Sequence, residues 1–205
     1  PDFHFEFPME GYYEPDTDAD MEDVRIPTVK ADAGAELEVH RTHGSAMTPQ
    51  EVYKQVNPAV VSVIVDFKGA VGVGTGVIFR EDGYVITNYH VVAGASDCMV
   101  MLHDGYSYSA KYVGGDKQRD VAVLKMDRSD LPAAEFGDSD LLEVGDTVYA
   151  IGNPLGVELR GTLTNGIISA VNRDVEMDGR TLTLLQTNAA LNSGNSGGPL
   201  INEYG

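Results

Sequence analysis

The sequence predicts an all-β protein of two antiparallel β-barrels of the six-stranded type, with a short N-terminal helix and a second barrel incomplete at the C-terminus. One observation is the composition of the 205 residues, which include 23 Gly, no Trp and many Val, Ile and Thr, the β-branched types that strands favour. The other is a succession of short apolar or alternating runs separated by Gly, Asp and Asn turns. Because no helices separate these runs, we expect antiparallel barrels, whose closure removes exposed strand edges.

The net charge of −18 argues against nucleic acid as a partner, because phosphate binding needs clustered Lys and Arg. The single cysteine, Cys98, excludes an internal disulfide framework. No apolar run approaches the roughly 20 residues that span a bilayer, and no signal peptide opens the chain. The chain begins at Pro1 rather than Met, which is compatible with the removal of an upstream targeting or anchor segment.

Residues 1–47 hold 12 acidic and 3 basic residues, a net charge of −9. Such a segment buries little apolar surface, so we expect it to be disordered or in contact with another subunit. Phe3, Phe5 and Phe7 alternate like one face of a strand and are the candidates for that contact, with a mobile terminus as the alternative.

An acidic run in this segment resembles a calcium-binding loop only superficially. Asp16, Asp18 and Asp20 occupy the first three ligand positions of such a loop. However, Met21 stands where the loop needs Gly, and Pro27 stands where it needs Glu. We therefore predict no metal site.

The barrels are expected to begin after a short helix. Thr48 is its predicted N-cap, Pro49 its first residue, and Glu51 completes a capping box. Asn57 and Pro58 are expected to end it.

Strand candidates then fall into two groups, which predict an N-terminal barrel over residues 48–130 and a C-terminal barrel over residues 131–205. Turn residues dominate the junction at 126–146. The first group comprises residues 59–67, 71–80, 83–87, 97–104, 106–114 and 120–125, and the second comprises 147–152, 158–173, 180–186 and 199–202. The second group is too small to close a barrel, which would leave strand edges open.

A glycine-rich loop follows the strand candidate 180–186. Gly permits sharp turns with positive φ, so the loop can present the Ser196 hydroxyl while nearby amides point at one spot, as an oxyanion hole requires. Alone, this pattern also fits a surface turn.

A serine nucleophile needs an adjacent base, usually His, which a third group orients. His90 follows an apolar run, whereas the other four histidines lie in the acidic segment or in a turn. Asp120 precedes an apolar strand, where a carboxylate needs a partner that a His N–H can supply. The competing Asp116 is more typical of a solvated turn. His90, Asp120 and Ser196 thus occur in the order His, Asp, Ser, which is the triad order of two-barrel proteases.

The glycine-rich residues 72–76 raise the alternative of a phosphate-binding loop. They lack the Lys and the helix that follow in a P-loop. We interpret them as a β-turn between strands.

Five separated motifs resemble, in order and spacing, the HtrA/Deg family of trypsin-like serine proteases, and the similarity runs from about Thr48 to Gly205. The motifs are TNYHVV at 87–92, DVAVLK at 120–125, AIGNPLG at 150–156, TNGIIS at 164–169 and GNSGGPL at 194–200.

This resemblance implies a serine endopeptidase that cleaves unfolded or misfolded polypeptides in protein quality control, without metal or cofactor. It implies that Ser196 is the nucleophile, His90 the general base and then acid, and Asp120 the carboxylate that orients His90. The backbone N–H groups of Gly194 and Ser196 would form the oxyanion hole. Leu191 would line the S1 pocket and favour a small aliphatic residue before the cleaved bond.

Family members continue beyond this region with two further strands and usually a PDZ domain, and they commonly form homotrimers through N-terminal segments. The resemblance also implies an extracytoplasmic location in the bacterial cell envelope, secreted or tethered to the membrane. Ser196 lies nine residues before the last residue of the chain, so we expect its loop to be poorly supported. The alternative function is a latent or non-catalytic module that binds unfolded polypeptide.

Overall fold

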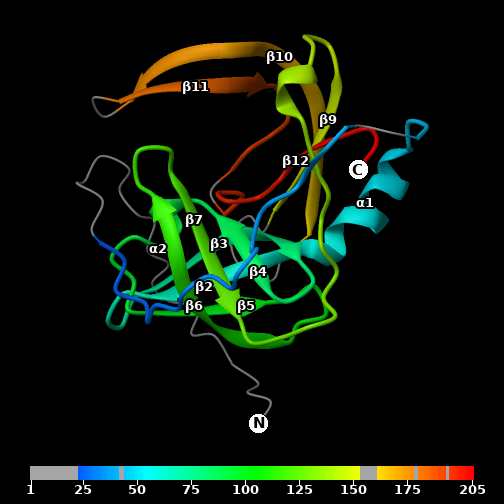
Figure 1. Ribbon diagram of the computed structural model, residues 1–205. Coiled ribbons are helices and arrows are strands. Elements are labelled where there is room, and N and C mark those ends of the chain that lie inside the picture. Colours follow the sequence, from blue (N-terminus) through cyan, green and yellow to red (C-terminus); the bar gives the residue numbers. More distant parts are fainter. Residues whose placement is uncertain (1–22, 42–43, 153–160, 178–179, 193) are drawn as a thin grey trace.

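The computed structural model describes residues 23–205, apart from 42–43, 153–160, 178–179 and 193. The N-terminal phenylalanines and most of the acidic run discussed above lie outside the described residues. The remainder forms a closed barrel and an open, curled sheet that lie next to each other (Figure 1). This architecture confirms the predicted fold class.

The first barrel consists of six antiparallel strands in the order β2-β3-β4-β7-β6-β5. Its interior holds the larger apolar core, in which Val63, Val85 and Leu124 are at most 1% exposed. The strands are β2 (Val60–Asp66), β3 (Val71–Arg80), β4 (Tyr84–Thr87), β5 (Asp97–Met101), β6 (Ser107–Asp116) and β7 (Val121–Met126). Each lies within a few residues of its predicted range, because turn residues bound every apolar run.

The second sheet has four strands in the order β11-β10-β9-β12 and, as expected, does not close. The long β10 pairs with β9 over residues 162–167 and with β11 over 168–177, so one strand serves both halves of the curled sheet. The strands are β9 (Thr147–Gly152), β10 (Thr162–Met177), β11 (Arg180–Thr187) and β12 (Leu200–Asn202). The division of the chain between residues 130 and 131 stays a prediction.

Helix α1 (Pro49–Val56) begins at the predicted cap. The Thr48 hydroxyl accepts a hydrogen bond from the Glu51 N–H, and the Glu51 carboxylate accepts one from the Thr48 N–H at 2.8 Å. The bonds from the Thr48 backbone and hydroxyl hold the pKa of Glu51 below its ordinary value. Buried Val52 and Val56 pack against apolar side chains of β9 and β12. Helix α1 therefore covers the second sheet (Figure 1).

Residues 24–34 are bonded to the first barrel, which differs from the solvated segment that we expected. Ile26 is only 2% exposed and belongs to the core of that barrel. The Arg25 N–H donates to the Ala95 carbonyl at 2.9 Å, and Tyr112 exchanges two backbone hydrogen bonds with the segment. The acidic composition of the segment did not indicate this packing, because most of the apolar side chains around Ile26 belong to the barrel.

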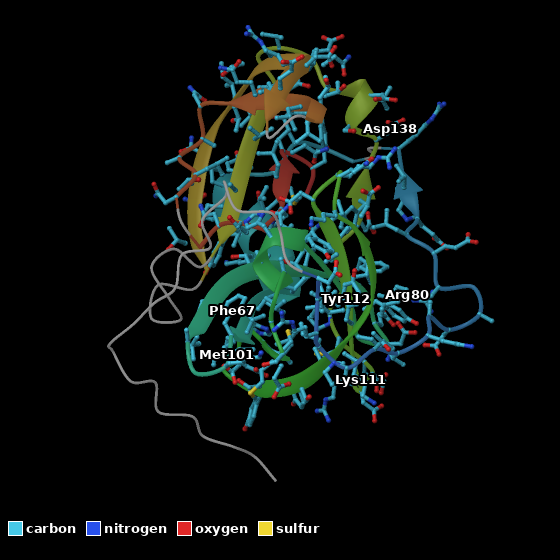
Figure 2. All side chains as sticks on the ribbon, turned by 90° about the vertical axis from the view of Figure 1, so that its left-hand side faces the viewer. Phe67, Arg80, Met101, Lys111, Tyr112 and Asp138 are labelled. Carbon is cyan, nitrogen blue, oxygen red and sulfur yellow. The ribbon has the colours of Figure 1, made fainter. Side chains whose placement is uncertain are left out.

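The segment continues across the β3–β4 side of the barrel, where Figure 2 shows Arg80 beside it. The Tyr84 hydroxyl donates to the Asp32 carboxylate at 2.9 Å and accepts the Asp32 N–H at 2.7 Å. The Arg80 guanidinium donates to the Gly34 carbonyl at 2.9 Å. These bonds fasten the segment at a second place.

Two short strands that the sequence did not predict follow. They are β1 (Val39–His40) and β8 (Phe136–Gly137), which pair in parallel. This pairing joins the N-terminal segment to the connection between the two sheets.

The glycine-rich residues 72–76 lie inside β3, which corrects their interpretation as a turn. A Cβ at Gly74 would meet Val91 at 2.7 Å, and one at Gly76 would meet Val85 at the same distance. Glycine is needed here because neighbouring elements pack directly on the strand. Among the described residues, no helix is long and apolar enough to cross a membrane.

Candidate active site

His90 lies on α2 (Tyr89–Val92), a single helical turn that follows β4. His90 thus follows the apolar run, as the sequence indicated, but on a helical turn that was not predicted. Asn88 occupies the N-cap with an extended backbone, and Val91 and Val92 point into the barrel core. The His90 imidazole is turned outward from this core, with 23% of its side chain exposed.

Asp120 directly precedes β7, and the pairing of β7 with β4 brings it beside α2. One carboxylate oxygen accepts the His90 N–H at 2.8 Å, and the other lies 2.7 Å from His90 Nδ1. The Asn88 side-chain amide donates to the Asp120 carbonyl at 2.8 Å. Asp120 also has a φ of +55°, which few non-glycine residues adopt and which is often found at functional sites. Three hydrogen bonds thus hold one strained residue against His90.

This geometry assigns the proton on the imidazole. An ionised carboxylate can only accept, so His90 Nδ1 carries a hydrogen and donates a hydrogen bond to Asp120. In the neutral imidazole Nε2 then has a free lone pair, as a general base requires. The pair therefore fits the first half of the predicted triad.

Asp116 and the other described histidines do not join this pair. Asp116 accepts N–H groups of Gln118 and Arg119 and forms an ion pair with the Arg119 guanidinium at 2.6 Å. The hydrogen bonds from Arg119, with its backbone N–H first, lower the pKa of Asp116. His40 lies on β1 and His103 is exposed in a turn. Asp116 is thus the turn residue that the sequence indicated, while His4 and His43 lie outside the described residues.

The loop that carries Ser196 is bonded to the middle of β3. The Thr75 N–H donates to the Ser196 carbonyl at 2.8 Å, and the Thr75 hydroxyl donates to the Gly194 carbonyl at 2.6 Å. Gly198 N–H closes a turn on the Asn195 carbonyl at 2.8 Å. The described part of this loop is therefore supported by the first barrel, although we expected poor support.

Gly197 is required at its position for two reasons. Its φ of +85° is the left-handed conformation that L side chains rarely adopt. In addition, a Cβ there would collide with the Thr75 carbonyl and the Thr87 hydroxyl. The chain after Ser196 can pass this close to β3 and β4 only as glycine.

Helix α2 and the loop of Ser196 both approach Gly74 of β3. A Cβ at Gly74 would meet both Val91 on α2 and, at 3.3 Å, the Ser196 carbonyl. Helix α2 and the serine loop therefore pack on the same stretch of strand. The structure describes both Ser196 and His90 and records no hydrogen bond between them.

The N–H groups of Gly194 and Ser196 have no recorded acceptor within the described part of the chain. Gly194 has a φ of +94°, and the Asn195 N–H next to it donates to Asn192 at 3.0 Å. Both predicted oxyanion donors thus lie in the loop held by Thr75.

Leu191 lies on the segment that leads to this loop and is 61% exposed. The preceding residues are held on β10, where the Thr164 hydroxyl donates to the Ala190 carbonyl at 2.9 Å and the Ile167 N–H donates to the Asn188 side chain at 2.8 Å. An exposed apolar side chain on a fixed segment is suited to contact a substrate. Among the described residues, no cluster of His, Cys, Asp and Glu could hold a metal ion.

The closed barrel and the open second sheet agree with a trypsin-like fold, and His90, Asp120 and Ser196 follow the chain order of two-barrel serine proteases. The family model of the trypsin-like peptidase domain matches residues 74–205. The chain therefore belongs to the trypsin-like peptidase family, and its similar relatives and structures are HtrA/DegP proteases.

Its relatives include a probable periplasmic serine endoprotease DegP-like of Chlamydia trachomatis, 51% identical over 132 residues, which are 64% of this chain and 26% of that protein. The serine protease Do-like HtrA of Bacillus subtilis is 50% identical over 142 residues, which are 65% of this chain and 32% of that protein. Among solved structures, the HtrA-type protease AlgW with a tripeptide matches with a TM-score of 0.71 and 39% identity, over 77% of this chain and 51% of that chain. The chain thus spans about a quarter to a third of the length of these curated relatives.

Sequence reasoning missed two residues that hold the site, Asn88 and Thr75. Asn88 lies inside the motif TNYHVV and Thr75 inside the glycine-rich residues 72–76, and both bond to carbonyls distant in sequence. The carbonyls that they bind come close only in the folded chain, so sequence alone could not identify them. The only local signal was a polar residue next to apolar ones.

Proposed function

We propose that this chain is the catalytic domain of a serine endopeptidase with Ser196 as nucleophile. The observation that carries the proposal is the two-point contact of Asp120 with His90, at 2.7 and 2.8 Å. The Gly194 and Ser196 N–H groups of the serine loop have no recorded acceptor among the described residues. In the neutral imidazole, a hydrogen on Nδ1 facing Asp120 leaves the Nε2 lone pair to take the Ser196 proton.

The reaction would proceed in two stages. Ser196 Oγ attacks the scissile carbonyl carbon while its proton moves to His90 Nε2, and the resulting oxyanion accepts the N–H groups of Gly194 and Ser196. The C–N bond then breaks, and His90 gives its proton to the leaving amine. Water, deprotonated by His90, attacks the acyl ester in the same way and releases Ser196.

The substrates we propose are unfolded or misfolded polypeptides, cut after small aliphatic residues that contact Leu191. The names of the DegP-like relatives support an extracytoplasmic location. A homotrimer with subunit contacts through Phe3, Phe5 and Phe7 belongs to the same proposal, as do a PDZ domain and a membrane anchor outside this sequence.

The test is cleavage of casein by the full-length protein and by its Ser196→Ala variant. We expect the variant to lose cleavage by several orders of magnitude, as triad variants of serine proteases do. Undiminished cleavage by Ser196→Ala would remove Ser196 as the nucleophile.

One observation favours the alternative of a latent module that binds unfolded chains without turnover. No hydrogen bond joins Ser196 to His90, although such bonds are often long before substrate binds. Tight binding of reduced, carboxymethylated casein by the folded protein, with no cleavage at any substrate concentration, would favour latency.

A further inference from the structure

The serine loop owes its shape to a residue of the other barrel. Thr75 is completely buried in β3, and it bonds to the carbonyls on both sides of the Asn195–Ser196 pair. Its hydroxyl donates to Gly194 at 2.6 Å and its N–H donates to Ser196 at 2.8 Å. One residue thus restrains the loop at two points.

These two carbonyls control the directions of the proposed oxyanion donors. A peptide group is planar, so a fixed Gly194 carbonyl fixes the peptide plane that follows Gly194. The Gly194 N–H and the fixed Gly194 carbonyl are attached to the two sides of the same Cα. The same holds for the Ser196 N–H and the fixed Ser196 carbonyl. Glycine has little conformational preference of its own, so Gly194 needs an external bond to hold its N–H in one direction.

Thr75 is itself held in one orientation. The buried Thr87 hydroxyl donates to the Thr75 carbonyl at 2.7 Å. The Thr75 methyl faces Gly198, 3.2 Å from where a Cβ on that residue would lie, while the hydroxyl bonds to the Gly194 carbonyl. Thr87 is followed by Asn88, which binds Asp120, so the same few residues connect both halves of the site.

Resting on the proposed function, we propose that Thr75 is a positioning residue for the oxyanion hole, acting through its hydroxyl on the Gly194 carbonyl. The backbone bond from Thr75 to Ser196 survives any side-chain change. The hydroxyl bond does not, and its loss releases the peptide that follows Gly194. The consequence is weaker stabilisation of the oxyanion, with substrate binding largely preserved.

The test compares Thr75→Val, Thr75→Ser and Thr75→Ala in the full-length protein. Val keeps the shape without the hydroxyl, while Ser and Ala differ from each other only by that hydroxyl. Ser62→Ala is the matched control, because Ser62 pairs with Thr75 on the neighbouring strand and its buried hydroxyl has no partner in the described structure. Near-ultraviolet circular dichroism verifies that each variant is folded.

We expect kcat for a peptide amide to fall about 10- to 100-fold in Thr75→Val and Thr75→Ala, somewhat less than for loss of an oxyanion donor. KM should change less than about 3-fold, and Thr75→Ser and Ser62→Ala should stay within about 3-fold of the parent protein in both constants. Affinity for a peptide aldehyde, which forms the tetrahedral adduct, should fall in parallel with kcat.

Equal kcat values for Thr75→Ala and Thr75→Ser would overturn the role of the hydroxyl, even if Thr75→Val does not fold. A rise in KM with unchanged kcat would overturn it as well. Failure of the proposed function looks different, because Ser196→Ala would then retain the activity of the parent protein.

Discussion

Replacement of Asp120 by Asn tests whether Asp120 selects the catalytic tautomer of His90. In the parent protein the Asp120 carboxylate accepts two hydrogen bonds, from the His90 backbone N–H at 2.8 Å and from His90 Nδ1 at 2.7 Å. An amide has only one oxygen. If that oxygen keeps the backbone N–H, the NH₂ group faces Nδ1, and two donors cannot occupy this distance.

His90 must then move its proton to Nε2, where it can no longer accept the Ser196 proton. A change of this kind lowers kcat of a serine protease about 10⁴-fold, which corresponds to roughly 5 kcal/mol of transition-state stabilisation. The assay is hydrolysis of a peptide amide by Asp120→Asn at neutral pH. Asp116→Asn is the matched control, because that carboxylate lies only four residues away and pairs with Arg119. A loss below about 10-fold for Asp120→Asn, or an equal loss in both variants, would refute the reasoning.

Two further predictions concern the first barrel. Ile26→Ala should lower the free energy of unfolding by about 2–4 kcal/mol in urea titrations, because loss of a side chain that is only 2% exposed leaves a cavity. Val39 is 58% exposed, so Val39→Ala should change this free energy little. Equal effects of the two substitutions would show that Ile26 does not pack as described. Burial, and next the Asp97 carboxylate, raise the pKa of Cys98 to about 12, so the folded protein should resist a thiol reagent at pH 8 and react fully in 6 M guanidinium. Rapid reaction of the folded protein at pH 8 would contradict the burial of Cys98. Because the pKa of this thiol is higher in the folded than in the unfolded state, its contribution to the stability of the folded state decreases as pH rises from about 9 toward 12.

The strands were predictable because their signals are local. Each main strand is an apolar or alternating run with turn residues at both ends, as β2 and β7 illustrate. Helix α1 was equally predictable from Thr48, Pro49 and Glu51. The three proposed catalytic residues could be predicted in their chain order because each lies near such a run.

What the sequence could not predict depends on distant partners or on very short elements. Helix α2 has a single turn and thus no helical periodicity, so the turn that carries His90 was not predicted. The pairing of β1 with β8 spans two residues and leaves no pattern. Ile26 is buried by the barrel beside it, and Thr75 acts on carbonyls 119 or more residues away, which no local pattern reports.

The central claim is that His90 and Asp120 activate Ser196 within a formed oxyanion hole. A fluorophosphonate probe tests this most directly, because its reaction requires both the activated hydroxyl and the N–H donors. Mass spectrometry of the folded full-length protein should place one label on Ser196, and His90→Ala should abolish it. No label on Ser196 in the folded protein, or the same label in His90→Ala, would contradict the account.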